Sequence, residues 1–159
     1  MENKKINFYI LSLASGYLAI VLKSLLNSYT GLNQIQLIST IIISPIFEEI
    51  FKFTSIYLLL LIFKQHSSDQ KTYAFSGVIL GFSFGVFEWV LGYPNALWSD
   101  RVLATLAHMG FGYFVGRSTY FSSITQWKNA GINLGVAILC HILWNEVSIF
   151  IANWGLIVS

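Results

Sequence analysis

Charged residues are scarce in this sequence. Asp, Glu, Lys and Arg make up 10% of its 159 residues, whereas ordinary soluble domains carry about 25%. Hydrophobic residues make up 55%, so a soluble fold of this size could not cover its surface with polar groups. The single Cys140 allows no internal disulfide, and the net charge of +2 is too small to indicate nucleic-acid binding. These shortages exclude a soluble enzyme, a disordered chain and a disulfide scaffold, and they favour a small integral membrane protein.

Long apolar runs occupy most of the chain, and about 20 such residues cross a bilayer as a helix. We therefore predict an all-α membrane bundle of about five transmembrane helices, or six, in one integral membrane domain over residues 1–159. The predicted spans are about 6–26, 35–63, 72–91, 101–120 and 129–151. No small-residue cleavage site follows the first run, which we interpret as a retained span rather than a signal peptide.

The second run is too long for one straight crossing, and it contains Pro45. Proline cannot donate the helical hydrogen bond to Ile41. The helix therefore either kinks at Pro45, or a shallow entry precedes a crossing that starts there.

Basic residues near the ends of the spans predict the orientation. Only Lys23 and Arg101 fall on the side that the model of five spans makes external. Six others fall on the opposite side: Lys4, Lys5, Lys64, Lys71, Arg117 and Lys128. This asymmetry predicts a cytoplasmic N-terminus.

Several polar residues lie inside the predicted spans, where a charge needs a reason. They are Glu48, Glu49, Lys52, Glu88, His108, His141, Asn145 and Glu146, of which Glu88 and Glu146 can also snorkel to the outer interface. At a rise of 1.5 Å per residue, all lie within roughly 15 Å of the external boundary. Four spans thus bring polar groups to one level, which indicates a shared site.

Each of these features also has a purely structural interpretation. Glu48 and Lys52 are four residues apart and can form an intrahelical ion pair. His108 can be a buried, hydrogen-bonded histidine, and His141 with Asn145 can join neighbouring helices. Gly77, Gly81 and Gly85 are spaced for close helix packing.

Carboxylates and histidines at one depth permit the activation of water. A poorly solvated glutamate can act as a general base, and histidine or asparagine can donate hydrogen bonds to a developing oxyanion. Alternatively, two histidines and one glutamate can hold Zn²⁺ with an open position for water. The sequence contains no HExxH motif, so the strong zinc signature is missing. No serine elbow and no intramembrane Asp pair is present either.

Four short motifs occur in order on successive spans. Residues 48–52 read EExxK and residues 84–88 read FxxxE; His108 follows alone, and residues 141–145 read HxxxN. In this order the motifs resemble the PrsW family of intramembrane proteases, within a wider group that includes CAAX-processing and bacteriocin-processing proteases and the APH-1 subunit of gamma-secretase. The CAAX branch has EExxxR and FxxxH, so this chain lies nearer PrsW. The resemblance covers about residues 45–145.

The resemblance implies a glutamate-dependent intramembrane endopeptidase in a prokaryotic plasma membrane, acting on a membrane-spanning or lipid-anchored protein. One glutamate of the pair Glu48 and Glu49 would activate water, His108 would orient it, and His141 with Asn145 would stabilise the oxyanion. Glu88 stands where the CAAX branch has histidine, and Lys52 would support the pair. Whether a metal takes part stays open, with zinc as the possible ion. The alternatives are a non-catalytic membrane scaffold or immunity-type protein of the same fold and a proton-coupled carrier.

Overall fold

The protein is described by a computed structural model over residues 2–30, 38–63, 69–95 and 97–158. These residues form five α-helices and one π-helical turn: α1 (Glu2–Thr30), η2 (Ser39–Ile43), α3 (Ser44–Ile62), α4 (Gln70–Gly92), α5 (Trp98–Ser123) and α6 (Trp127–Val158). The described residues contain no β-strand. The predicted all-α fold is therefore confirmed.

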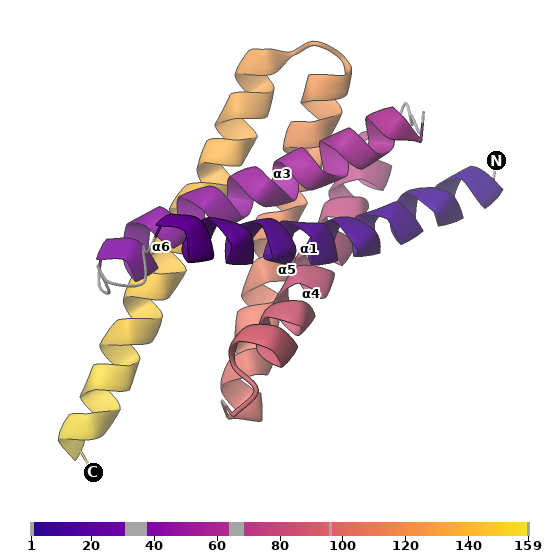
Figure 1. Ribbon diagram of the computed structural model, residues 1–159. Coiled ribbons are helices and arrows are strands. Elements are labelled where there is room, and N and C mark those ends of the chain that lie inside the picture. Colours follow the sequence, from indigo (N-terminus) through magenta and orange to yellow (C-terminus); the bar gives the residue numbers. More distant parts are fainter. Residues whose placement is uncertain (1, 31–37, 64–68, 96, 159) are drawn as a thin grey trace.

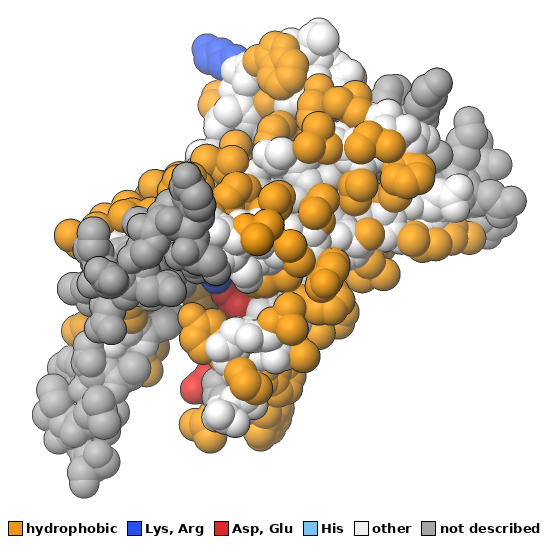
Figure 2. Space-filling view, in the orientation of Figure 1, with side chains coloured by type: hydrophobic (Ala, Val, Ile, Leu, Met, Phe, Trp, Pro, Cys, Tyr) orange, Lys and Arg blue, Asp and Glu red, His pale blue; other side chains and the backbone are white. Residues whose placement is uncertain are grey.

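Within the described part of the chain, three helices are long and apolar enough to cross a membrane, over Ile6–Leu26, Gln70–Gly92 and Trp127–Ile151. The helix α3 has the length, but it carries three charged residues in its first half. Apolar side chains are spread over the described part of the face shown in Figure 2, where few charged side chains appear, as expected of a surface in contact with lipid. The chain is an integral membrane protein by these features, and the exact number of crossings stays a prediction.

The break at Pro45 has a clear local geometry. Helix α3 begins at Ser44, so the proline lies in its first turn, where a missing N–H leaves no hydrogen bond unmade. The turn η2 precedes it directly. The predicted start of this run, residues 35–37, lies outside the described residues.

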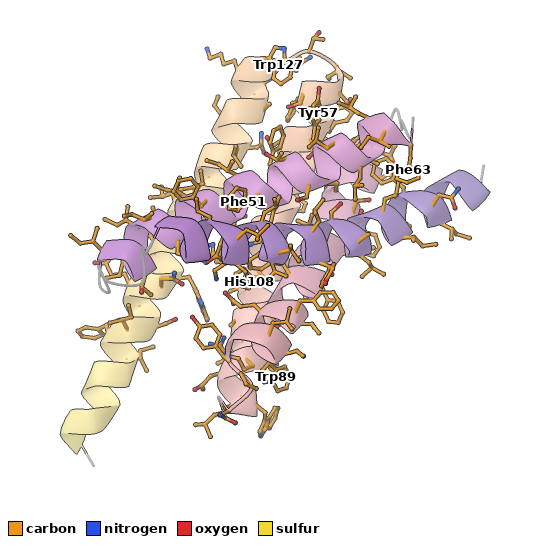
Figure 3. The ribbon with its side chains drawn as sticks, in the orientation of Figure 1. Phe51, Tyr57, Phe63, Trp89, His108 and Trp127 are labelled. Carbon is orange, nitrogen blue, oxygen red and sulfur yellow. The ribbon has the colours of Figure 1, made fainter. Side chains whose placement is uncertain are left out.

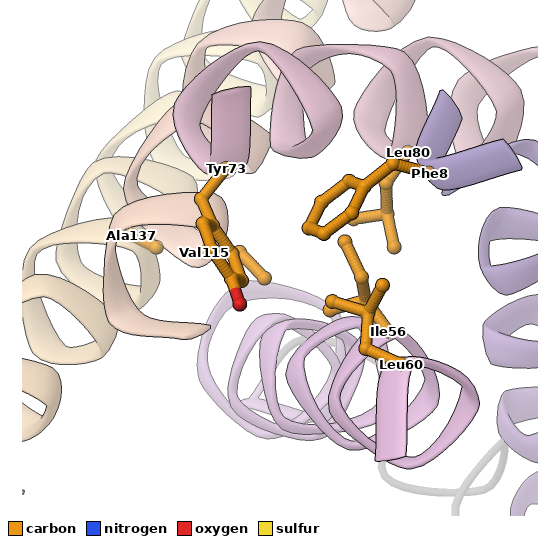
Figure 4. Close-up of a cluster of buried hydrophobic side chains, with 7 residues drawn as sticks. All are labelled: Phe8, Ile56, Leu60, Tyr73, Leu80, Val115 and Ala137. Carbon is orange, nitrogen blue, oxygen red and sulfur yellow. The ribbon is translucent and has the colours of Figure 1, made fainter. Parts of the chain in front are cut away.

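The helices form two layers. In Figure 1, α1 and α3 run side by side in front of α4, α5 and α6 and cross over them. All five α-helices supply side chains to one hydrophobic cluster at the crossing, drawn in Figure 4: Phe8, Ile56, Leu60, Tyr73, Leu80, Val115 and Ala137. The cluster holds the two layers in a fixed relative position, because each side chain packs against residues of other helices.

Helices α4 and α5 touch through their backbones. A Cβ atom on Gly77 would come within 2.7 Å of the Gly116 nitrogen, and one on Gly85 within 2.8 Å of the Thr105 Cα. Only glycine fits such contacts, which confirms the predicted close packing. This contact holds the end of α4 against the first half of α5.

Helix α1 docks on α4 by the same means. A Cβ on Gly16 would lie 2.6 Å from the Ser83 Cβ, and the Ser83 hydroxyl donates a 2.7 Å hydrogen bond to the Leu13 carbonyl. Ala19 and Ile20, one turn further on, pack with Phe84. These contacts fix the rotation of α1 about its axis. They thereby determine which residues in the last turns of α1 face the bundle.

Candidate active site

Charged and histidine side chains from all five α-helices converge beneath the crossing of the two layers. Figure 3 labels His108, which lies behind α1 in this region. We call the connected set the polar ring: Lys23 on α1, Glu48, Glu49 and Lys52 on α3, Glu88 on α4, His108 on α5 and His141 on α6. Six of these seven residues were singled out from the sequence, and Lys23 was not.

Helix α3 brings two glutamates and a lysine into the ring from consecutive turns. The Lys52 ammonium donates to Glu49 Oε1 at 2.6 Å, and both side chains are fully buried. The sequence interpretation paired Lys52 with Glu48, which is wrong. Glu48 instead pairs with Lys23 at 2.8 Å and accepts a 2.6 Å hydrogen bond from the Ser44 hydroxyl, both on Oε1. Residues three or four positions apart lie on the same face of a helix, so Lys52 can reach either glutamate. Lys23 on α1 decides between them, because it occupies Glu48.

His141 lies between the two glutamates. Its Nδ1 atom is 2.7 Å from Glu49 Oε1, and because a carboxylate can only accept, Nδ1–H donates this hydrogen bond. Its Nε2 atom faces Glu48 Oε2 at 3.7 Å. The Phe111 ring stacks on the imidazole at 4.7 Å between ring centroids and holds its plane. Glu49 thereby orients His141 so that Nε2 points at Glu48.

His108 is tied at both ring nitrogens. Lys52 Nζ lies 3.0 Å from Nδ1, and because an ammonium can only donate, Nδ1 accepts. The proton then resides on Nε2, which donates to Glu88 Oε2 at 3.2 Å. The Phe84 ring covers Lys52, with Nζ 4.2 Å from its centroid. His108 thus links α3 to α4 in a single tautomer.

Glu88 completes the ring at the end of α4. Its Oε1 atom accepts from Lys23 at 2.7 Å, and Arg101 lies 4.0 Å from Oε2. Glu88 therefore does not reach into lipid; it contacts cationic groups from α1 and α5. The ring thus contains three carboxylates and two lysine ammonium groups, and the Arg101 guanidinium lies beside it.

The ring has an open side and a closed side. The side chains of Lys23, Glu88 and Arg101 are 15%, 11% and 20% exposed, whereas Glu49 and Lys52 are at 0%. Figure 2 shows acidic and basic side chains in the notch between α6 and the α4–α5 pair. We call this notch the recess: Lys23, Glu88 and Arg101 are partly exposed at its mouth, and Glu49 and Lys52 are buried behind them.

Asn145 makes its described hydrogen bond outside the polar ring. Its side-chain Nδ2 donates a 2.9 Å hydrogen bond to the Thr40 carbonyl in η2. It therefore ties α6 to the turn that precedes α3. Among the described contacts, none joins Asn145 to the polar ring.

Lys23 is the site residue that the sequence interpretation missed, because it was counted only as an orientation marker at the end of a span. A signal was present nonetheless. Small and apolar residues at positions 8, 12, 15 and 19 follow the spacing of one helix face, and all four are buried. Position 23 continues that face, so the lysine points into the bundle.

Part of the ring matches a metal-binding group. Glu48, His108 and His141 each offer one ligand atom, and these atoms lie within 4.8 Å of one another. In the tetrahedral geometry of Zn²⁺, two ligand atoms that are each about 2.0–2.2 Å from the ion lie roughly 3.3–3.6 Å apart. Glu48 Oε2 has no hydrogen-bond partner among the described residues. The donor atoms, up to 4.8 Å apart, therefore fit an ion only after they close in by up to roughly 1.4 Å, and only if His108 releases Lys52 or Glu88.

An apolar groove between α5 and α6 runs beside the ring. Its walls include Leu106, Gly110, Leu143 and Trp144. Phe111 belongs to the groove and also packs on His141, so one ring separates the groove from the site.

These features define a class: a helical membrane protein with a buried carboxylate–histidine site and an adjoining apolar groove. The chain matches the family model described as "PrsW family intramembrane metalloprotease" over residues 6–159. It therefore belongs to the PrsW family of intramembrane proteases. No match was found among curated proteins or solved structures. The wider grouping with CAAX-processing proteases and APH-1 stays a prediction.

Proposed function

We propose that the chain is an endopeptidase that hydrolyses a peptide bond of a membrane-spanning or lipid-anchored protein, with water activated by a glutamate of the polar ring. The observation that carries this proposal is the Glu48 Oε2 atom, which is buried without a hydrogen-bond partner among the described residues and lies 3.7 Å from His141 Nε2. A buried carboxylate oxygen without a partner is costly to maintain. Its retention is expected where the oxygen serves a reaction.

In this mechanism Glu48 Oε2 accepts a proton as the water oxygen attacks the carbonyl carbon. The proton passes to the leaving nitrogen as the C–N bond breaks. Glu49 holds His141 in place through Nδ1, so that Nε2 can donate to the developing oxyanion when it carries a proton. Without a metal ion, activation thus falls to Glu48 and orientation of His141 to Glu49, although the two residues are adjacent in the motif.

The family description implies a metal, and the site offers a place for one. Glu48, His108 and His141 would hold a divalent ion, which would supply Lewis-acid polarisation of the scissile carbonyl. Glu49 Oε2 also lacks a hydrogen-bond partner among the described residues. With Glu48 engaged as a ligand, Glu49 is the carboxylate left to take the proton from water.

The surroundings support a membrane substrate. The groove between α5 and α6 is apolar and adjoins His141 through Phe111. A hydrophobic segment of a substrate can lie there while its peptide bond reaches the recess.

The test uses membrane vesicles from cells that lack the protein, supplied with the purified wild-type chain or with one of the variants Glu48→Gln, Glu49→Gln and His141→Ala. Mass spectrometry of new protein termini reads out cleavage. We expect new termini within or near spanning segments with the wild type only. Glu146→Gln serves as the control, because this exposed glutamate on α6 makes no described contact with the ring.

Two results would contradict the proposal. Equal cleavage by the wild type and all three variants would show that the ring is not the active site. If the folded wild type gives no new termini, the chain is a scaffold whose polar ring serves packing alone.

A further inference from the structure

Helix α1 presents one lysine to the site through a fixed register. Gly16 is pressed against Ser83, and Ser83 is bonded to the Leu13 carbonyl. Two turns after Gly16, the side chain of Lys23 enters the mouth of the recess with 15% of its surface exposed. A lysine near the end of a span commonly extends toward the headgroups, and this one turns inward instead.

Lys23 holds two carboxylates at once. Its Nζ atom lies 2.8 Å from Glu48 Oε1 and 2.7 Å from Glu88 Oε1. Charge-assisted contacts of this length are strong and directional. The two glutamates come from different helices, so a single ammonium fixes the distance between α3 and α4 at the mouth.

The contact also selects which oxygen of Glu48 is available. Lys23 and Ser44 both bind Oε1, which leaves Oε2 directed at His141. Without the ammonium, the Ser44 hydroxyl alone would hold the carboxylate, and Glu48 and Glu88 would face each other as like charges. The carboxylate would then rotate away from His141.

We infer that Lys23 is a positioning residue of the active site, which orients Glu48 by binding its Oε1 atom. This inference rests on the proposed function. It makes α1, which carries none of the family motifs, a required part of the site. A second consequence is that arginine, which also carries a fixed positive charge, should replace Lys23 in part, whereas a neutral side chain should not.

The first test measures kinetics with a substrate segment identified from the new termini. Lys23→Met should lower kcat at least tenfold with KM unchanged within about twofold, at a temperature where the variant is folded. Lys23→Arg should retain at least a third of the wild-type kcat. Lys71→Met is the matched control, since it removes a lysine that is exposed at the start of α4, and it should leave both constants unchanged. A folded Lys23→Met variant with wild-type kcat would overturn the inference.

The second test does not depend on activity. The loss of Tm caused by Lys23→Met is measured in the wild type and in a Glu48→Gln background. If Lys23 holds Glu48, the loss should shrink by at least a third in that background; an equal loss in both would overturn the inference. Should Lys23→Met fail to fold, Lys23→Met with Glu88→Gln replaces it, because that pair removes one charge of each sign. If the wild type cleaves nothing, the proposed function fails, and the Tm comparison alone decides whether Lys23 holds Glu48.

Discussion

The contact between α4 and α5 at Gly81 predicts a large effect from a single methyl group. A Cβ on Gly81 would overlap the His108 carbonyl oxygen, and it would lie 2.6 Å from the His108 carbonyl carbon and 2.9 Å from the Met109 Cα. Non-bonded carbons prefer about 3.5–4.0 Å. The Gly81→Ala variant must therefore move the two helices apart by about 1 Å.

The magnitude follows from comparison with Gly110, where an added Cβ meets nothing within 4 Å. Both substitutions gain about the same helix propensity, so the difference between them isolates the clash. Overpacking of this kind costs about 1–3 kcal/mol. We expect Gly81→Ala to be less stable than Gly110→Ala by about that free energy of unfolding.

The same movement should reach the site. Glu88 lies two turns beyond Gly81, and its bond to His108 Nε2 is already 3.2 Å long. A separation of about 1 Å would take it past hydrogen-bond distance. Unfolding of both variants in detergent micelles checks the stability, and termini formation in vesicles checks the activity. If the two alanine variants have equal stability, the backbone contact between α4 and α5 is not as described.

Three further perturbations test other parts of the structure. Lys52→Met leaves the fully buried Glu49 without its ammonium partner. Loss of one partner of a buried ion pair costs about 3–5 kcal/mol, which is measurable as a fall in Tm. A variant as stable as the wild type would contradict the pairing of Lys52 with Glu49. Ser83→Ala removes the hydrogen bond from α4 to the Leu13 carbonyl, so it should lower the free energy of unfolding by about 0.5–1.5 kcal/mol in the same assay. Unchanged stability would show that this hydrogen bond does not hold α1 against α4. In a competition assay with a chromophoric chelator, His141→Ala should weaken Zn²⁺ binding at least tenfold, since it removes one of three candidate ligands; equal affinities would place any bound zinc elsewhere.

The helical runs were readable from the sequence because apolar length alone identifies a membrane helix. The close packing of α4 was readable too, since its row of glycines lets another helix approach, but the sequence did not identify α5 as the partner. The convergence of polar groups was expected from their common depth, and the structure places Glu48, Glu49, Glu88, His108 and His141 in one connected set. Their catalytic roles stay a prediction.

The pairing inside the set was not readable. Sequence spacing gives the face of a helix on which a side chain lies, but not the rotation of that helix against its neighbours. Lys52 can reach either glutamate by spacing, and Lys23, from another helix, settles the choice by occupying Glu48. Asn145 shows the same limit, because its partner is the Thr40 carbonyl in a turn that no motif marks.

The polar ring ties the chemistry of the protein to its assembly. Each of the five α-helices contributes at least one member, so no group of four helices contains the whole site. On the proposed role of Lys23, Glu48 keeps its orientation toward His141 only while Lys23 binds its Oε1 atom, and the packing of Gly16 on α4 sets the position of α1. A partly assembled chain would therefore hold carboxylates without a fixed orientation. Such a chain should lack peptidase activity, which in a membrane restricts cleavage to molecules whose first helix is in place.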